Sequence, residues 1–338
     1  MPPVPRMITT PITAPPDPHV TTSRQTRELI TMTTTPSAFT ELWAERRHRI
    51  RVRDYPGDPP AIVLMHGFPD DQHLYDRALP FLAGRRRVVT FDFLGWGESD
   101  KPPGYPYTAQ NQTGDLDAVI TQLGLDEVVL VAHDSSGPPA IDWALANPAR
   151  VAALVLLNTY YGWMPSLRPP EAIILYATPI LRNLARPVMR LFDWPNRALY
   201  FWQVARFIRD EAVRRDLLPL YYDRFRAARP AFWRLNADLP RTLISRARRA
   251  PKLRAFDRPV RVVFGADDPY LNAGVARRFT KLFPTAQIQL IPNARHYVQV
   301  DEPQLVAEAI LSSHRPVGRS DGSSTRAPSE QPSPEPAP

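Results

Sequence analysis

The sequence predicts an α/β fold with a mostly parallel central sheet, helices on both faces of that sheet and an inserted helical cap. Short runs of strand-forming residues alternate with helical patterns from Phe39 onward, which is typical of strand–helix–strand units. The strand runs are almost continuously apolar, as strands covered on both faces must be. Between Asn158 and Val260, however, about a hundred residues show helical patterns without a buried strand. We therefore expect one large core that is interrupted by a helical insertion.

The elements of this core can be placed in order along the chain. Apolar runs that are short enough for strands lie at 61–66, 87–92, 127–133, 151–158, 260–265 and 286–292. Helical patterns lie between or after them at 109–123, 137–147, 274–283 and 303–312. In the insertion, EAIILYATPILRNLARPVMRLF and RALYFWQVARFI have the spacing of helices. No repeat with the period of a solenoid or propeller is present.

The domain organisation follows from these patterns and from composition. We expect a disordered tail at 1–36, core at 37–161 and 248–314, a helical cap at 162–247, and a second disordered tail at 315–338. The first tail is rich in Pro and Thr and the second in Pro and Ser, and neither has a periodic apolar pattern. Met32 stands just before the ordered pattern, so it is an alternative translation start to Met1.

Charge and cysteine content limit the classes of function. The chain has no cysteine, which rules out disulfides and thiolate chemistry, and no histidine pair has metal-site spacing, so we expect neither metal nor cofactor. The net charge is +8, and residues 162–254 carry 19 Lys and Arg against 7 Asp and Glu. We interpret this surplus as a solvated arginine-rich surface, with contact to a membrane surface or acidic partner as the less favoured alternative. No nucleic-acid module is visible. No apolar run reaches the length of a membrane span or signal sequence, so we expect a soluble cytoplasmic protein.

A strand that runs into a helix at Ala132-His133-Asp134-Ser135-Ser136 is the strongest sign of chemistry. A nucleophile on such a sharp turn needs small residues two positions before and after it. Ala132 and Ser136 flank Asp134 in this way, whereas Ser135 as nucleophile would put His133 at a crowded position. Asp134 is therefore the preferred nucleophile. Ser135, and a simple helix-capping role for Asp134, remain the alternatives.

Three further motifs follow apolar runs, namely His66-Gly67-Phe68-Pro69, Gly265-Ala266-Asp267-Asp268-Pro269 and Asn293-Ala294-Arg295-His296-Tyr297. With them the sequence resembles the α/β-hydrolase superfamily over residues 39–312, in the order nucleophile, acid, histidine. The resemblance implies Asp268 rather than Asp267 as the acid, and His296 as the base. Asn158, at the end of the preceding strand, offers no competing carboxylate there. His66 and His133 are interpreted as structural.

An aspartate nucleophile implies a two-step hydrolysis. Asp134 would attack an sp³ carbon to form an ester, and His296, oriented by Asp268, would activate water to cleave it. The backbone N–H groups of Phe68 and Ser135 would form the oxyanion hole.

The cap-bearing members with this nucleophile resemble epoxide hydrolases and haloalkane dehalogenases. In dehalogenases, halide donors occupy the positions of Ser135 and Phe68, so a cap tryptophan would have to replace them; the candidates are Trp163, Trp194 and Trp202. Epoxide hydrolases use cap tyrosines as acids, for which the candidates are Tyr176, Tyr221 and Tyr222, although each could equally be a packing residue. We prefer epoxide opening, with dehalogenation as the alternative.

The expected substrate is a small apolar molecule that reacts with water. Large apolar side chains of the cap should form its pocket, and the candidates are Trp163, Ile174, Tyr176, Phe201, Phe225 and Trp233. Two other classes remain open, an ester hydrolase that uses Ser135 and a non-catalytic ligand-binding protein. The sequence does not predict the oligomeric state.

Overall fold

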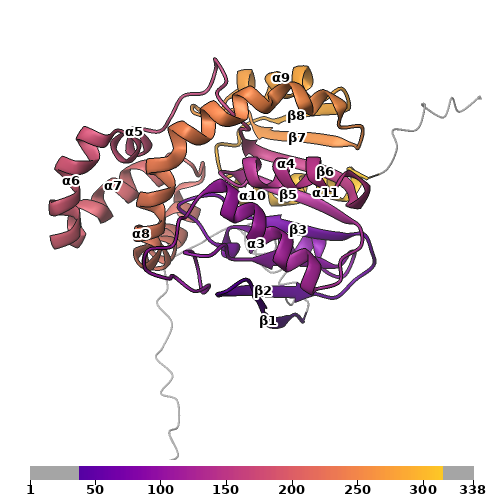
Figure 1. Cartoon of the computed structure of the whole chain (residues 1–338), viewed down its shortest axis with the longest axis horizontal. Coiled ribbons are helices and arrows are strands. Elements are labelled where there is room, and N and C mark those ends of the chain that lie inside the picture. The colour runs from indigo at the N-terminus through magenta and orange to yellow at the C-terminus, as the bar shows by residue number, and fades with distance from the viewer. Residues whose placement is uncertain (1–37, 315–338) are drawn as a thin grey trace, which may run out of the picture. The chain divides into compact units, whose positions relative to one another are not determined.

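The computed structural model describes residues 38–314, which contain one eight-stranded sheet (Figure 1). Its order is β1-β2-β4-β3-β5-β6-β7-β8. The strands are β1 (Thr40–Glu45), β2 (Arg49–Tyr55), β3 (Ala61–Met65), β4 (Val88–Phe91), β5 (Val128–Asp134), β6 (Val151–Thr159), β7 (Val260–Gly265) and β8 (Ala286–Ile291). β1 and β2 are antiparallel to their neighbours, and the other strands are parallel. The predicted α/β class is confirmed, while the predicted tails and Met32 lie outside the described residues.

The central strands form where the sequence is continuously apolar. All residues of β3, β4 and β5 are buried, because helices cover both faces of the sheet. Each of the six predicted strands is present to within one residue at either end. β1 and β2 were not predicted. In β2 buried residues alternate with more exposed ones, whereas in β1 Ala44 is the one buried residue, and the polar side chains of both strands hide the strand pattern.

Helices pack on both faces of the sheet (Figure 1). α3 and α4 pack on each other, and α2 and α11 form a second pair. The helices of the core are α2 (Leu79–Leu82), α3 (Ala109–Gln122), α4 (Gly137–Ala146), α9 (Ala273–Leu282), α10 (Val298–Asp301) and α11 (Pro303–Ser312), with short 3-10 helices η1 (Gln72–Tyr75), η2 (Pro148–Arg150) and η3 (Ala250–Ala255). Polar caps begin two of the predicted helices: Thr108 accepts from the N–H of Asn111 at α3, and Asn272 accepts from that of Gly274 at α9.

The insertion between β6 and β7 is helical, and lies to one side of the sheet (Figure 1). Its helices are α5 (Glu171–Ala177), α6 (Pro179–Leu191), α7 (Asp193–Val204) and α8 (Glu211–Arg249). α8 has 39 residues and continues through three internal prolines. The predicted end of the cap at residue 247 therefore falls inside the last turn of α8. Within residues 38–314, no helix combines the length and apolarity needed to cross a bilayer.

Candidate active site

Asp134 stands on a sharp turn between β5 and α4. Its φ of 49° lies in the left-handed region, which is strained for a residue with a side chain. The turn leaves little space around it. A Cβ on Gly67 would lie 2.6 Å from Asp134 Cβ, and the buried Ser136 Oγ accepts the N–H of His133 at 2.8 Å. The Thr159 hydroxyl, from the end of β6, donates to the carbonyl oxygen of Asp134. These contacts hold Asp134 at the carboxyl end of the sheet.

The loops after β7 and β8 bring an acid and a histidine to the same place. His296 Nδ1 lies 2.8 Å from Asp268 Oδ2, which is the distance of a charge-assisted hydrogen bond. On the other side of the ring, Nε2 lies 4.0 Å from Asp134 Oδ1, beyond a direct hydrogen bond. The three side chains are buried. The structure thus brings together the three residues that the sequence motifs indicated, with Asp134 Oδ1 facing His296 without a direct hydrogen bond to it.

Asp268 is held as an ion by several donors. Its Oδ1 accepts the N–H groups of Tyr270 at 2.8 Å and Leu271 at 3.1 Å, and its Oδ2 accepts Asn158 Nδ2 at 2.8 Å. Burial by itself raises the pKa of Asp268, but His296 and these hydrogen bonds outweigh it, so that the net pKa is lowered. From the sequence, Asn158 was notable only for its lack of a carboxylate. Here its amide also accepts the N–H of Gly265 at 2.8 Å, and so links β6 to the acid-bearing loop.

Burial and neighbouring charges act in opposite directions on the pKa values of Asp134 and His296. Burial raises the pKa of Asp134, and this effect exceeds the opposing effects of His296 and of the N–H groups of Phe68 and Ser135. Burial lowers the pKa of His296, but the charge and hydrogen bond of Asp268 together with the nearby Asp134 and Asp70 outweigh it, so the net pKa is raised. The N–H of Phe68 donates to Asp134 Oδ2 at 3.2 Å. This donor and Ser135 N–H therefore already contact the predicted nucleophile.

His66 and His133 contact backbone groups and do not line the cavity. His66 Nε2 accepts the N–H of Phe93 at 3.1 Å, and its Nδ1 lies 2.7 Å from the carbonyl oxygen of Gly67. His133 Nε2 lies 3.0 Å from the carbonyl oxygen of His296. Burial lowers the pKa of both rings. Both histidines are thereby suited to fix loops in their neutral form.

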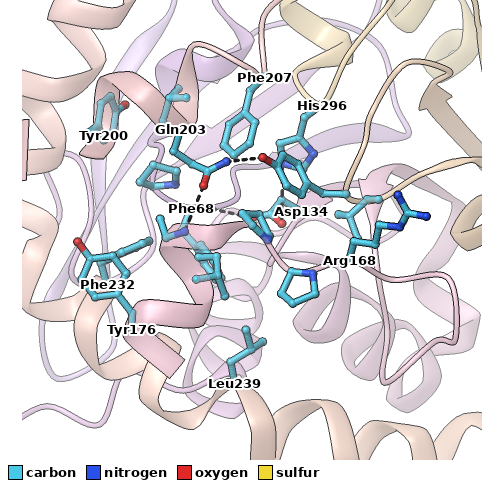
Figure 2. Close-up of a pocket in the computed structure, with 18 of the residues that line it drawn as sticks. Phe68, Asp134, Arg168, Tyr176, Tyr200, Gln203, Phe207, Phe232, Leu239 and His296 are labelled. Carbon is cyan, nitrogen blue, oxygen red and sulfur yellow. Dashed lines mark hydrogen bonds and ion pairs between the residues drawn. The ribbon is translucent and has the colours of Figure 1, made fainter. Parts of the chain in front are cut away.

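Asp134 and His296 border a cavity of about 920 Å³, its open mouth included (Figure 2). Helices α5, α7 and α8 and the loop after β6 provide most of its apolar wall. Of the side chains proposed for the pocket or as acids, those that line the cavity are Trp163, Tyr176 and Phe225, and Phe68, proposed for the oxyanion hole, also lines it. Others that sequence analysis did not name are Tyr200, Gln203, Phe207, Phe232 and Tyr270. Among the described residues, no cluster of three potential metal ligands occurs.

Five of the cap residues proposed from sequence do not line this cavity: Ile174, Phe201, Tyr221, Tyr222 and Trp233. Phe201 packs under the guanidinium of Arg197, and Trp233 packs edge-on against Tyr176. The Tyr222 hydroxyl donates to the carbonyl oxygen of Asp193 at 3.3 Å, while Tyr221 borders a separate small space beside Asp70. The helical phase explains these corrections, because a neighbour one position away, such as Ile173 or Phe232, faces the cavity instead.

Tyr200 is the cavity tyrosine that sequence analysis missed. Its hydroxyl is buried and has no hydrogen-bond partner among residues 38–314. It lies on one face of α7 with Gln203 and Val204. This i, i+3, i+4 spacing was a usable signal, but the surrounding run ALYFWQV is apolar on every side and does not indicate which side faces the cavity.

Comparison with known proteins connects this arrangement to a family and to several activities. The family model described as alpha/beta hydrolase fold matches residues 60–303. A cis-3-alkyl-4-alkyloxetan-2-one decarboxylase of Xanthomonas campestris is 29% identical over 271 residues, which cover 75% of this chain and 88% of that protein. Haloalkane dehalogenase 2 of Mycobacterium tuberculosis is 27% identical over 285 residues, 81% of this chain and 94% of that one.

A solved structure of an epoxide hydrolase from Vigna radiata superimposes with a TM-score of 0.65 over 81% of this chain and 98% of its own. At 19% identity, this likeness is one of fold alone.

Proposed function

The chain belongs to the α/β hydrolase fold family, and on that premise we propose that it is a hydrolase in which Asp134 forms a covalent ester with an apolar substrate, with an epoxide as the preferred electrophile. The helical insertion, with residues 162–247 as its proposed extent, acts as the cap over the cavity. A cytoplasmic location remains our prediction for the protein.

One observation carries the proposal: the residue on the strained turn at the cavity is a carboxylate that faces a histidine. His296 Nε2 is 4.0 Å from Asp134 Oδ1. Ser135 instead borders a different small space, together with Pro138 and Leu235, and among the described residues no hydrogen bond joins it to His296. This supports Asp134 as the nucleophile over the ester hydrolase that uses Ser135. A ligand-binding protein would have no need for the Asp268–His296 pair beside this carboxylate.

In the first step, Asp134 Oδ1 attacks one ring carbon of the epoxide and the bond from that carbon to the ring oxygen breaks. The oxygen takes a proton from a tyrosine hydroxyl, so a hydroxyalkyl ester and a tyrosinate result. Tyr176 and Tyr200 are the proposed donors because both line the cavity. The hydroxyl of Tyr200 has no protein partner among the described residues, and that of Tyr176 contacts only the weak acceptor Met189 Sδ at 3.6 Å. Both are therefore available to a ligand oxygen.

In the second step, His296 Nε2 takes a proton from water, and the hydroxide adds to Asp134 Cγ. The oxygen at the position of Oδ2 carries the developing negative charge, which the N–H groups of Phe68 and Ser135 stabilise. Collapse of this intermediate releases the diol and restores the carboxylate. The remaining proton returns from His296 to the tyrosinate, so the sum is epoxide plus water giving diol.

Dehalogenation is the second candidate reaction. The position of Trp163 at the cavity favours it. Of the three cap tryptophans considered as halide donors, Trp163 lines the cavity, whereas Trp194 and Trp202 do not. A relative with 27% identity is named a haloalkane dehalogenase. Another, with 29% identity, is named for an oxetan-2-one, which like an epoxide is a strained oxygen ring. Both substrate classes therefore belong in the test.

The test is to trap the ester. His296→Gln protein would be incubated with panels of epoxides, haloalkanes, cis-3,4-dialkyl oxetan-2-ones and simple esters, and its intact mass measured. We expect an adduct that maps to Asp134 and retains the ring oxygen. Asp134→Asn should abolish both the adduct and turnover, by about 10³-fold or more, while the matched change Ser135→Ala should keep both. Turnover that survives Asp134→Asn but is lost with Ser135→Ala would overturn the proposal.

A further inference from the structure

Helix α6 carries its apolar face outward, away from the protein. In a helix that packs on a globular core the apolar stripe faces the core. Here none of the 13 residues of α6 is buried. The residues that are partly covered, and hence turned toward the protein, are Arg182, Ala185 and Met189. The opposite face is therefore the apolar one, and it is unpartnered in the described chain.

The outer face is continuous and large. Ile180, Leu184, Val188 and Leu191 share one side of α6 at intervals of three and four residues, and Phe192 and Trp194 follow directly; we call these six the outer apolar face. Ile180, Leu184, Leu191 and Trp194 are each 70–76% exposed. Figure 1 shows α6 at the end of the helical insertion that is farthest from the sheet. Contiguous apolar surface of this kind usually marks a contact site.

Arginines border the outer apolar face. The carboxylate nearest to it in sequence is already paired with arginines. Arg186 and Arg190 lie along one flank of α6, and Arg197 follows on α7. α6 itself contains no acidic residue. The nearest carboxylate in sequence, Asp193, is paired with Arg226 and Arg229 from α8. An apolar stripe with tryptophan and arginine neighbours is the pattern of a helix that lies in the interface of a bilayer.

We propose that the outer apolar face docks the protein on the surface of a membrane that contains anionic lipid. The apolar side chains would enter the headgroup–acyl boundary, while the arginines contact lipid phosphates. A second copy of the chain is the competing occupant. A symmetric contact through α6 would place Arg186 and Arg190 of both copies close together without acidic partners, and this repulsion disfavours it. Anionic lipid supplies the opposite charge.

Docking through α6 would bring the cavity close to the membrane. Met189 on its inner side contacts the hydroxyl of Tyr176 and the side chain of Asn196, and both residues line the cavity. The docked helix is thus one side-chain layer away from the cavity. An apolar molecule dissolved in the bilayer would be concentrated close to the cavity. The docking itself does not depend on which reaction Asp134 performs.

The experiment is sedimentation of the full-length chain with vesicles. One set contains phosphatidylcholine alone and the other about one-third phosphatidylglycerol, each at low and at high salt. We expect binding to the anionic vesicles that weakens with salt. Leu184→Glu/Leu191→Glu and Arg186→Glu/Arg190→Glu should each reduce partitioning more than tenfold, since one basic residue contributes about fivefold. The matched control Leu305→Glu, on α11 and 39% exposed, should bind like wild type.

Two further measurements test the docking even if a variant folds poorly. Trp194 fluorescence should shift to the blue when wild-type protein binds, and Trp194→Phe should lose this part of the shift. Light scattering reports the oligomeric state of every variant. Absence of binding to either vesicle, or binding that persists in the leucine variant, would overturn the proposal. A wild-type dimer that becomes monomeric in the leucine variant without any vesicle binding would assign the face to a second copy instead.

Discussion

Replacing Asp70 by asparagine should stabilise the protein at neutral pH and flatten the pH dependence of its stability. Asp70 follows the Phe68-Pro69 segment and is 7% exposed. Its Oδ1 accepts the hydroxyl of Tyr297 at 2.5 Å, and its Oδ2 has no hydrogen-bond partner among the described residues. Burial raises the pKa of Asp70 to about 8, assisted by the charge of Asp134 and only partly opposed by the Tyr297 hydrogen bond. The carboxyl is therefore mainly protonated at pH 7.

Proton linkage gives the sign and the size of the expected change in unfolding free energy. With a pKa of 3.8 in the unfolded chain and about 8 in the folded one, the folded state binds the extra proton between these values, so stability falls as pH rises. The slope is about 1.4 kcal/mol per pH unit, or at most about 4 kcal/mol at pH 7. Asparagine avoids this cost and retains an acceptor for Tyr297. Its unpartnered amide group costs about 1–3 kcal/mol, which leaves a net gain of about 1–3 kcal/mol.

The assay is urea unfolding of wild type, Asp70→Asn and Asp216→Asn at pH 5, 6, 7 and 8. Asp216 is exposed on α8 and serves as the matched control. Between pH 5 and 7 the unfolding free energy of wild type should fall by about 3 kcal/mol more than that of Asp70→Asn, and Asp216→Asn should follow wild type. Other titrating groups cancel in this comparison. Parallel curves for wild type and Asp70→Asn would mean that Asp70 is ionised in the folded protein, and would refute the reasoning.

Three further predictions concern the candidate site. Tyr200→Phe and Tyr176→Phe should each slow epoxide hydrolysis by about 10²-fold or more but leave haloalkane turnover unchanged; equal losses on both substrates would point to packing. Because the pKa of His296 is raised and its neutral form is the base, the Asp134 ester should accumulate as pH falls below that pKa, as seen by quenched intact mass; a pH-independent ester level would contradict this role. Asn158→Ala removes hydrogen bonds to Asp268 and Gly265 and should lower the unfolding free energy by about 2–4 kcal/mol; it should also shift the pH profile of ester hydrolysis to higher pH, because an Asp268 carboxylate with fewer donors holds the His296 proton more strongly, whereas a loss of stability alone would limit Asn158 to a structural role.

The parts of the fold that could be predicted from the sequence are those in which complete burial makes the apolar pattern unambiguous. β3 and β5 are buried along their whole length, so their apolar runs have no polar interruptions and their limits are clear. The sharp turn at Asp134 was predictable from side-chain size, since Ala132 and Ser136 are small, and the close approach of Gly67 to Asp134 shows how crowded this turn is.

Other features depend on tertiary contacts that no local pattern contains. β1 and β2 owe their strand conformation to pairing with each other and with β4. The internal prolines at 219, 230 and 240 argue locally for breaks, yet α8 is continuous, because packing against α5 and α7 supports it and outweighs the lost hydrogen bonds. The side that each cap aromatic faces is set by helix phase, which is why Tyr200 was missed while Trp233 was proposed.

The surroundings of three buried aspartates near His296 assign different roles to the same side chain. Asp268 receives four donors and stays ionised with a lowered pKa. Asp134 receives backbone N–H groups and has a raised pKa, and Asp70 receives one hydroxyl and reaches a pKa of about 8. If all three were ionised, His296 could not balance their charge. Because Asp70 is held neutral, the site retains two carboxylates around one imidazole, one fixed by its donors and the other in the position of the proposed nucleophile.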